Sequence, residues 1–342
     1  MRLFKLLSVG CLSLLSLAIH AETLNGLYQV REPVGSQTPD ERNQATQRAL
    51  ETLVLRLTGD RQAVQSPGLA EVRKDPRQII SQYGYDAGPP QSLQVDFDPV
   101  STDRALRGAG LALWGSNRPS ILGWWLSDST EGSSLVGDGQ SAAEPLRRAA
   151  VHRGLPLRLP LADLDEQIVA TAKNLEGADA SPLHGASERY GADALLAVHA
   201  HQNGTQWEAK WRLWLGDQKE QGVAQGADTA ALADAVLLAV SERLAPRFAV
   251  KPGVATDQLL EVQGMNLERY AALGHLLEPF GGRPLSVDGE RIVYQVSGNA
   301  EQLRAQLGLA KLLEVPPGEV PLAVNDPAAV AAAPTPRLRF RW

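Results

Sequence analysis

Cysteine is almost absent from this 342-residue sequence, and the single one, Cys11, lies in an apolar run near the start. No disulfide can form within the chain, so the fold must depend on its core. The sequence also has no obvious Lys/Arg cluster, and 39 acidic against 33 basic residues give a formal net charge of -6. These features make nucleic acid an unexpected partner.

Catalytic and cofactor motifs are missing as well. No serine lies in a G-x-S-x-G nucleophile elbow, and no nucleophile-base pair, metal cluster or phosphate-binding loop stands out. We therefore expect no cofactor. Enzyme activity stays uncertain at this point, with a non-catalytic role favoured.

The first residues have the pattern of an export signal. Arg2 and Lys5 precede an apolar run over 6–19, and Ala21 is the small residue expected before a cleavage site. We expect a signal peptide, residues 1–21, to be removed from an exported chain. Cys11 fits this run as an apolar residue better than as a lipid attachment site. No later stretch is long enough for a transmembrane span, so none is expected in the mature chain.

The rest of the sequence predicts a multi-domain α/β and α+β fold made of small mixed-sheet modules. Its expected parts are an N-terminal βααβαβ module (22–118), a central mixed-sheet α/β domain (119–250), a small βαββα module of ferredoxin-like type (256–315) and a Pro/Ala-rich tail (316–342) that ends in RLRFRW.

Local signals place several elements of the N-terminal module. Thr38-Pro39-Asp40-Glu41 is a capping box with proline at the first helical position, so it predicts the start of a long helix. Pro76 is expected to open a short helix through Tyr83. Alternation of apolar and polar residues predicts strands over 92–98 and 111–114.

The central domain contains a predicted three-stranded meander closed by a helix. Strands are expected over 194–201 and 206–215 with Asn203-Gly204 in the turn between them, and a third strand over 221–225. Asp228 is a good N-cap, and apolar residues recur at helical spacing from there to Pro246.

Two sequence blocks carry a resemblance to known families. The early block TPDERNQATQRALETLVLRLTGD and the middle block RYGADALLAVHAHQNGTQWEAKWRLWLGD resemble the envelope family called domain of unknown function 2066, over most of 22–315. This resemblance implies a Gram-negative periplasmic protein without an established activity. More weakly, GADALL (191–196) and WRLWLGD (211–217) resemble the N-terminal α/β domain of TolB, CsgG and penicillin-binding-protein activator lipoproteins. Those relatives imply an accessory role.

Two sets of residues are candidate ligand sites in the central domain. His199 and His201 are two residues apart on a predicted strand, so they share one face and are weak candidates for a metal site if a third ligand such as His184 is near. Solvent-facing or helix-contacting histidines are the favoured interpretation.

The loop over 127–141 lies between a strand and a helix, which is where open α/β sheets bind ligands. Its candidate residues are Ser133, Ser134, Gly137 and Asp138. A surface loop without a ligand is the simpler interpretation.

Two further clusters have a structural and a functional interpretation. Asp163, Asp165 and Glu166 could flank a glycosidic bond, although their spacing fits helix capping better. Trp214, with Trp124 or Trp125, could stack on a sugar, although core packing is favoured for the tryptophans.

The final segment alternates cations with large apolar groups. Its candidate partner-binding residues are Arg337, Leu338, Arg339, Phe340, Arg341 and Trp342. Such a strand can pair with the sheet of its own chain, with a partner or membrane, or stay disordered, and these alternatives remain open. Together, the sequence favours a non-enzymatic accessory or assembly protein of the periplasm that contacts another envelope protein. The alternative is a glycan or small-molecule binder or hydrolase that uses the 127–140 loop.

Overall fold

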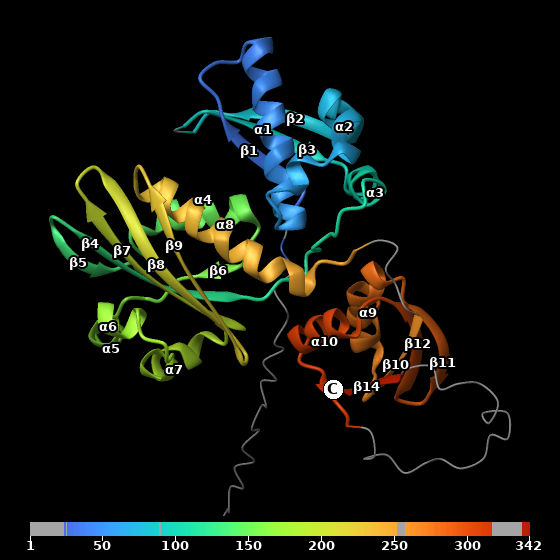
Figure 1. The fold of residues 1–342 in the computed structure, drawn as a ribbon. Coiled ribbons are helices and arrows are strands. Elements are labelled where there is room, and N and C mark those ends of the chain that lie inside the picture. Colours follow the sequence, from blue (N-terminus) through green and yellow to red (C-terminus); the bar gives the residue numbers. More distant parts are fainter. Residues whose placement is uncertain (1–23, 25, 89, 252–256, 317–336) are drawn as a thin grey trace, which may run out of the picture.

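The computed structural model describes residues 24, 26–88, 90–251, 257–316 and 337–342, and it contains three α/β units, each around its own sheet (Figure 1). The mixed α/β, multi-domain fold class predicted from the sequence is confirmed. The predicted signal peptide and tail residues 317–336 lie outside the described residues.

The N-terminal unit is a three-stranded antiparallel sheet of order β1-β3-β2 with a long helix against it. The Thr38 side chain accepts a hydrogen bond from the Glu41 amide, and Gly59 ends the helix in a left-handed conformation, φ 60°. The elements are β1 (Gln29–Pro33), α1 (Pro39–Thr58), α2 (Ala70–Lys74), β2 (Ile80–Asp86), β3 (Ser92–Phe97) and α3 (Pro99–Gly108), with short 3-10 turns at Ala63–Gln65, Pro67–Leu69 and Pro76–Ile79.

The predicted order βααβαβ for this unit is wrong at two places. The segment after Pro76 forms one 3-10 turn and then strand β2, because its backbone pairs with β3 from Ile80 to Asp86. The predicted strand over 111–114 is reduced to a single bridge between Leu113 and Val250. In the first segment, pairing with β3 overrides the local pattern, and in the second the described chain offers one bridging residue pair, which is too little for a strand.

The central unit has a six-stranded sheet in which β5, β4, β7, β8 and β9 are neighbours in this order and β6 also pairs with β4. Strands β4 and β7 are parallel, whereas β7, β8 and β9 form the predicted antiparallel meander. The strands are β4 (Ile121–Ser129), β5 (Gly132–Leu135), β6 (Leu157–Arg158), β7 (Ala194–Asn203), β8 (Gln206–Leu215) and β9 (Gln218–Gly226).

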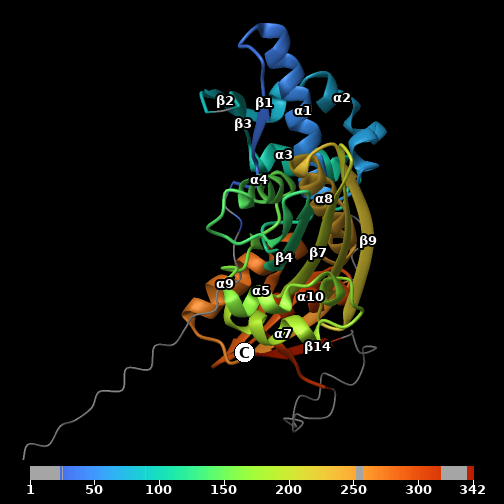
Figure 2. The same cartoon turned by 90° about the vertical axis from the view of Figure 1, so that its left-hand side faces the viewer.

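Helices cover both faces of this sheet (Figures 1 and 2). One face packs on α4 and α8, and the other on α5, α6 and α7, so the sheet separates two apolar clusters. The helices are α4 (Ala143–Arg153), α5 (Leu164–Val169), α6 (Ala172–Leu175), α7 (Ser181–Ser187) and α8 (Thr229–Phe248), with a 3-10 turn at Glu188–Tyr190.

Three details of the central prediction need correction. The β7–β8 turn is centred one residue later, because Asn203 pairs with Gln206 and only Gly204 has positive φ. Helix α8 starts after Asp228 as predicted but continues past Pro246 to Phe248. In the predicted loop over 127–141, residues 127–129 continue strand β4 and residues 132–135 form strand β5, which pairs with β4.

The C-terminal unit is a five-stranded sheet of order β11-β12-β10-β14-β13. Its first part has the predicted order βαββα. The short strand β13 follows, and the last strand, β14, inserts parallel to β10 and separates it from β13. The elements are β10 (Asp257–Gln263), α9 (Leu267–Leu277), β11 (Arg283–Asp288), β12 (Arg291–Ser297), α10 (Ala300–Leu309), β13 (Leu313–Glu314) and β14 (Arg337–Arg341), with a 3-10 turn at Glu278–Phe280.

Both helices of the C-terminal unit lie on the same face of its sheet. Leu273 of α9 and Leu303 of α10 pack in one cluster with Leu260, Tyr294 and Phe340 from the strands. The opposite face carries no helix of the described chain. Across the residues that the structure describes, no helix combines the length and the hydropathy that a membrane crossing requires.

Candidate functional site

His199 lies in the second half of strand β7, within a cluster of charged side chains. Its Nδ1 is 2.7 Å from Oε1 of Glu176, at the end of α6, and its Nε2 is 2.6 Å from Oδ2 of Asp128, at the end of the parallel strand β4. Lys210 reaches the same Glu176 carboxylate at 2.9 Å. The crevice beyond the carboxyl ends of parallel strands is where α/β sheets commonly bind ligands.

The pairing of both ring nitrogens with carboxylates favours the charged imidazolium form. Burial of the ring acts to lower the pKa of His199, but the hydrogen bonds to Asp128 and Glu176 outweigh this effect and raise the pKa above its usual value. An imidazolium with both N–H groups engaged has no lone pair for a metal ion or for proton abstraction. The cluster is therefore built as an ion-pair network.

The other candidate metal ligands do not complete a site. His201 contacts Glu208 at 3.6 Å, and its ring centroid is 6.1 Å from that of His199. His184 lies at the other end of the sheet, where it lines a pocket of about 450 Å³ with Leu122. Within the described parts of the chain, no three His, Cys, Asp or Glu side chains are arranged to hold a metal ion.

The state of His199 predicts how the free energy of unfolding depends on pH. A histidine whose pKa is raised on folding stabilises the protein fully below the unfolded-state pKa of about 6.5, and this contribution is lost as pH rises through the folded-state pKa. We expect the wild-type protein to lose about 1 kcal/mol more than H199Q over that interval, because one charge-assisted hydrogen bond is lost.

Urea denaturation between pH 5.5 and 9 measures this difference. H201Q is the matched control, since His201 is more exposed and its one ion pair among the described residues is the longer contact with Glu208. Equal pH dependence of wild type and H199Q would contradict the assignment.

The candidate ligand loop over 127–141 is held by its own contacts. Ser133 lies in β5 beside Asp128, and Ser134 pairs with Ser127. Burial of the Asp128 carboxyl acts to raise its pKa, but Ser133 and His199 lower it overall. Two candidates, Ser133 and His199, thus meet at the same carboxylate.

The second half of this loop packs closely on the chain before α5. A Cβ on Gly137 would lie 2.7 Å from the Ala162 side chain, so only glycine fits there. The Asp138 amide donates to the Pro160 carbonyl at 2.7 Å, and the Asp138 carboxylate pairs with Arg147 at 2.9 Å. The loop residues are engaged within the protein, and they do not converge on an open ligand site.

The carboxylates at the start of α5 cap the helix. Asp163 and Glu166 form a reciprocal capping box, and Arg189 pairs with both carboxylates. Asp165 lies in the same first turn. The capping interpretation of the sequence therefore agrees with the structure.

A glycan platform of tryptophans is wrong, because the indoles proposed for it lie inside the protein. Trp124 is fully buried, and Trp125 and Trp214 are 6% and 8% exposed. Stacking on a sugar needs an accessible aromatic face, which these residues do not offer.

The terminal segment pairs with the sheet of its own chain. Leu338 and Phe340 of β14 enter the core of the C-terminal unit with exposed fractions of 7% and 2%. Trp342 packs against that core and its ring lies under the Arg269 guanidinium, with 5.5 Å between the guanidinium carbon and the ring centroid. Of the open alternatives for this segment, the structure adopts pairing within the chain.

Alternation along β14 places its three arginines on the helix-free face of the sheet. The register of β10 and β12 adds Glu261 and Arg291 to that face, and Arg283 of β11 lies there too. We name this surface the arginine face, and its cations are Arg283, Arg291, Arg337, Arg339 and Arg341.

Glu261 lies at the centre of the arginine face and is 2% exposed. Its carboxylate is 3.1 Å from Arg337, 3.7 Å from Arg339 and 3.7 Å from Arg291. The sequence identified the three arginines of the tail as candidate partner-binding residues. It gave no sign that Arg283 and Arg291, about fifty residues earlier, share their face, because pairing between distant strands is not visible in a local pattern.

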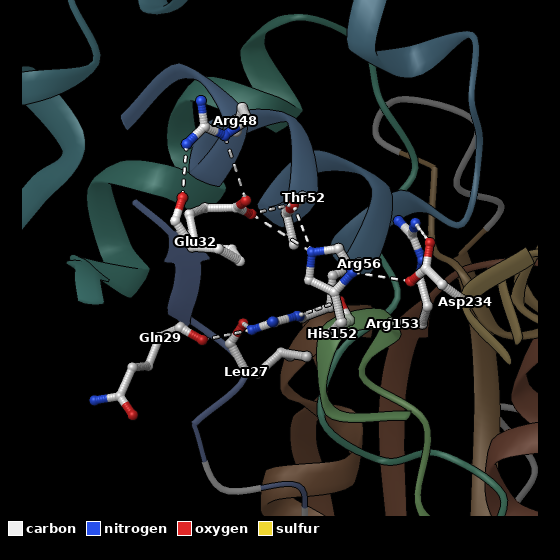
Figure 3. A network of polar contacts seen from close by, with 10 residues as sticks. Leu27, Gln29, Glu32, Arg48, Thr52, Arg56, His152, Arg153 and Asp234 are labelled. Atoms are coloured by element: carbon white, nitrogen blue, oxygen red, sulfur yellow. Dashed lines mark hydrogen bonds and ion pairs between the residues drawn. The ribbon is translucent and has the colours of Figure 1, made fainter. Parts of the chain in front are cut away.

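A second polar network, missed in the sequence, joins the N-terminal and central units (Figure 3). His152 at the end of α4 contacts Asp234 of α8 at 2.9 Å through Nδ1 and Thr52 of α1 at 3.0 Å through Nε2. Glu32 of β1 accepts from Thr52 at 2.7 Å. Burial acts to lower the pKa of His152, but Asp234 and Glu32 raise it overall.

Two buried arginines complete this junction. Arg56 donates to the backbone carbonyls of Leu27 and Gln29, and to that of His152 across the interface (Figure 3). Arg118 is 1% exposed and lies over the Trp114 ring, with 4.2 Å between the guanidinium carbon and the ring centroid. Burial lowers the pKa of Arg118 to about 9, which leaves the group charged at neutral pH. The network fixes how the two units are joined.

Comparison with known proteins gives one match. Residues 21–115, the N-terminal unit, match a family described as a domain of unknown function (DUF8605). No curated protein and no solved structure matches the chain. The resemblance to domain of unknown function 2066 is therefore wrong, and the resemblance to TolB, CsgG and the activator lipoproteins has no support. The chain is thus similar to a known family over its N-terminal unit.

Proposed function

We propose that this protein is a non-enzymatic accessory protein of the bacterial envelope that acts in the periplasm by binding another envelope protein. The observation that carries the proposal is the C-terminal sheet, whose two helices cover one face and leave the arginine face without a covering helix among the described residues. A charged sheet face of this kind is a surface for association.

The side chains that could perform chemistry support the same proposal. His199 and His152 each contact acceptors through both ring nitrogens, and Asp163 and Glu166 cap a helix. The alternative function, a glycan or small-molecule binder or hydrolase at the 127–140 loop, has less support. Gly137 is packed against the chain and the Asp138 carboxylate is paired with Arg147.

Site-specific photo-crosslinking in cells tests the proposal. A photoreactive residue replaces Ser286 on the exposed strand β11, and the same residue at Glu51 on the exposed surface of α1 is the matched control. We expect a discrete protein adduct from position 286, recovered with the periplasmic fraction, and no such adduct from position 51.

Two results would overturn the proposal. One is retention of the protein in the cytoplasmic fraction with its first 21 residues uncut. The other is the absence of any protein adduct at position 286 while the exported protein is present at normal level.

A further inference from the structure

The arginine face carries more positive than negative charge. Its five arginines are opposed by three carboxylates on the same face, namely Asp257, Glu261 and Asp288. Asp257 already accepts hydrogen bonds from Ser297 and Gln295. The chain as a whole has a net charge of -6, so this excess of cations is local.

The cations are accessible and only partly engaged. Arg291, Arg337 and Arg339 share the Glu261 carboxylate, and Arg291 also pairs with Asp288 at 3.7 Å, while their side chains are 43%, 37% and 30% exposed. Arg283 and Arg341 are exposed and have no ion-pair partner within the described residues. Each guanidinium carries five N–H donors, so most donors of this face point to solvent.

We propose that the arginine face binds an extended acidic peptide segment of a partner protein. Arg337, Arg339 and Arg341 follow one another at every second residue, so their positions repeat about every 6.7 Å along β14. Acidic side chains at every second position of an extended segment repeat with the same spacing. Guanidinium groups bind carboxylates through two parallel hydrogen bonds, which fixes the register of such a segment.

Glu261 shows which anion these arginines accept. Three guanidinium groups from β12 and β14 converge on its carboxylate, so the face already binds a carboxylate of its own chain. A lipid surface fits less well. Its binding requires apolar side chains that stand out beyond the cations. Val293, in the middle of the face, is 6% exposed, and Leu313, which is 59% exposed, lies on the short edge strand β13 opposite Arg341. Single-stranded nucleic acid needs aromatic stacking, and Tyr294 and Phe340 lie on the core side.

Fluorescence anisotropy with defined probes tests this inference, which rests on the proposed function. The main probe is a labelled peptide in which five Glu alternate with five Thr. A second peptide of the same composition, with its five Glu in one block, tests whether the spacing matters. A Lys/Thr peptide tests the sign of the charge. Vesicles of phosphatidylglycerol or phosphatidylcholine and inorganic phosphate distinguish the other anions.

Two variants separate binding from folding. R283Q/R341Q removes cations that have no ion-pair partner in the described chain, so the fold is preserved, and R337Q/R339Q/R341Q removes the repeated row. The matched control R61Q/R243Q removes the same charge as the double variant. Arg61 follows the end of α1 and Arg243 lies in α8, and their side chains are 59% and 55% exposed.

We expect the alternating Glu peptide to bind, with affinity that falls as salt rises and is weakened about tenfold in the double variant but unchanged in the control. Equal affinity for wild type and R283Q/R341Q, binding to phosphatidylglycerol vesicles alone, or no binding to any probe would overturn the inference. An unchanged adduct at position 286 in R283Q/R341Q would also overturn it while leaving the proposed function intact.

Discussion

Replacing Arg118 with methionine is expected to lower the free energy of unfolding by about 3–5 kcal/mol. The Arg118 guanidinium donates to four backbone carbonyls, those of Arg56, Trp114, Gly115 and Gly154, at 2.6–3.0 Å. Methionine fills a similar volume but donates no hydrogen bond, so these carbonyl oxygens lose their donor. The end of α1, the chain into β4 and the chain after α4 would then lose their common link.

Urea denaturation followed by tryptophan fluorescence measures this change, because Trp114 lies against Arg118. R61M is the control, since Arg61 makes one exposed ion pair with Glu242, and we expect it to alter the free energy of unfolding by less than about 1 kcal/mol. R118K should fall between them, because lysine keeps the charge but loses the planar fork. A value for R118M within about 1 kcal/mol of wild type would contradict the role assigned to Arg118.

Replacing Phe340 with alanine is expected to destabilise the C-terminal unit by about 3–5 kcal/mol. The Phe340 side chain is 2% exposed and packs with Leu260, Leu303 and Tyr294. Its loss leaves a cavity and weakens the hold of β14 beside β10, where five residue pairs connect the strands from Leu259–Arg337 to Gln263–Arg341.

Hydrogen exchange of the β10 peptide, residues 257–263, reports this effect directly. We expect F340A to accelerate exchange there and to leave the central strands β7 and β8 unchanged. The neighbouring variant R341A is the control for stability, because Arg341 is exposed and has no ion-pair partner in the described chain. Normal protection of 257–263 in F340A would show that β14 adds little to the unit.

Signals within a few neighbouring residues predicted where several helices begin and where one strand lies. The cap at Thr38 begins α1 as expected, and Asp228 caps α8 as expected. The alternation of Leu338 and Phe340 with arginines indicated an extended strand, and the structure decides among the open alternatives by pairing it within its own chain. These features depend on residues within a few positions of one another, so a single sequence reveals them.

Features that depend on distant partners were not predicted. Strand β5 is rich in glycine and serine and exists because β4 offers a free edge to pair with. The junction of His152 with Glu32 and Asp234 joins residues about a hundred positions apart. The arginine face likewise needs the register of β10, β12 and β14, which periodicity alone does not specify.

The insertion of β14 between β10 and β13 sets an order of events during synthesis. A ribosome makes β10 to β13 before residues 337–341, so a nascent chain lacks the strand that belongs between β10 and β13. Until β14 arrives, the edge of β10 and the apolar cluster beneath it stay open to solvent and to chaperones. The C-terminal sheet is therefore completed only after residues 337–341 have been made, by pairing between strands far apart in the sequence.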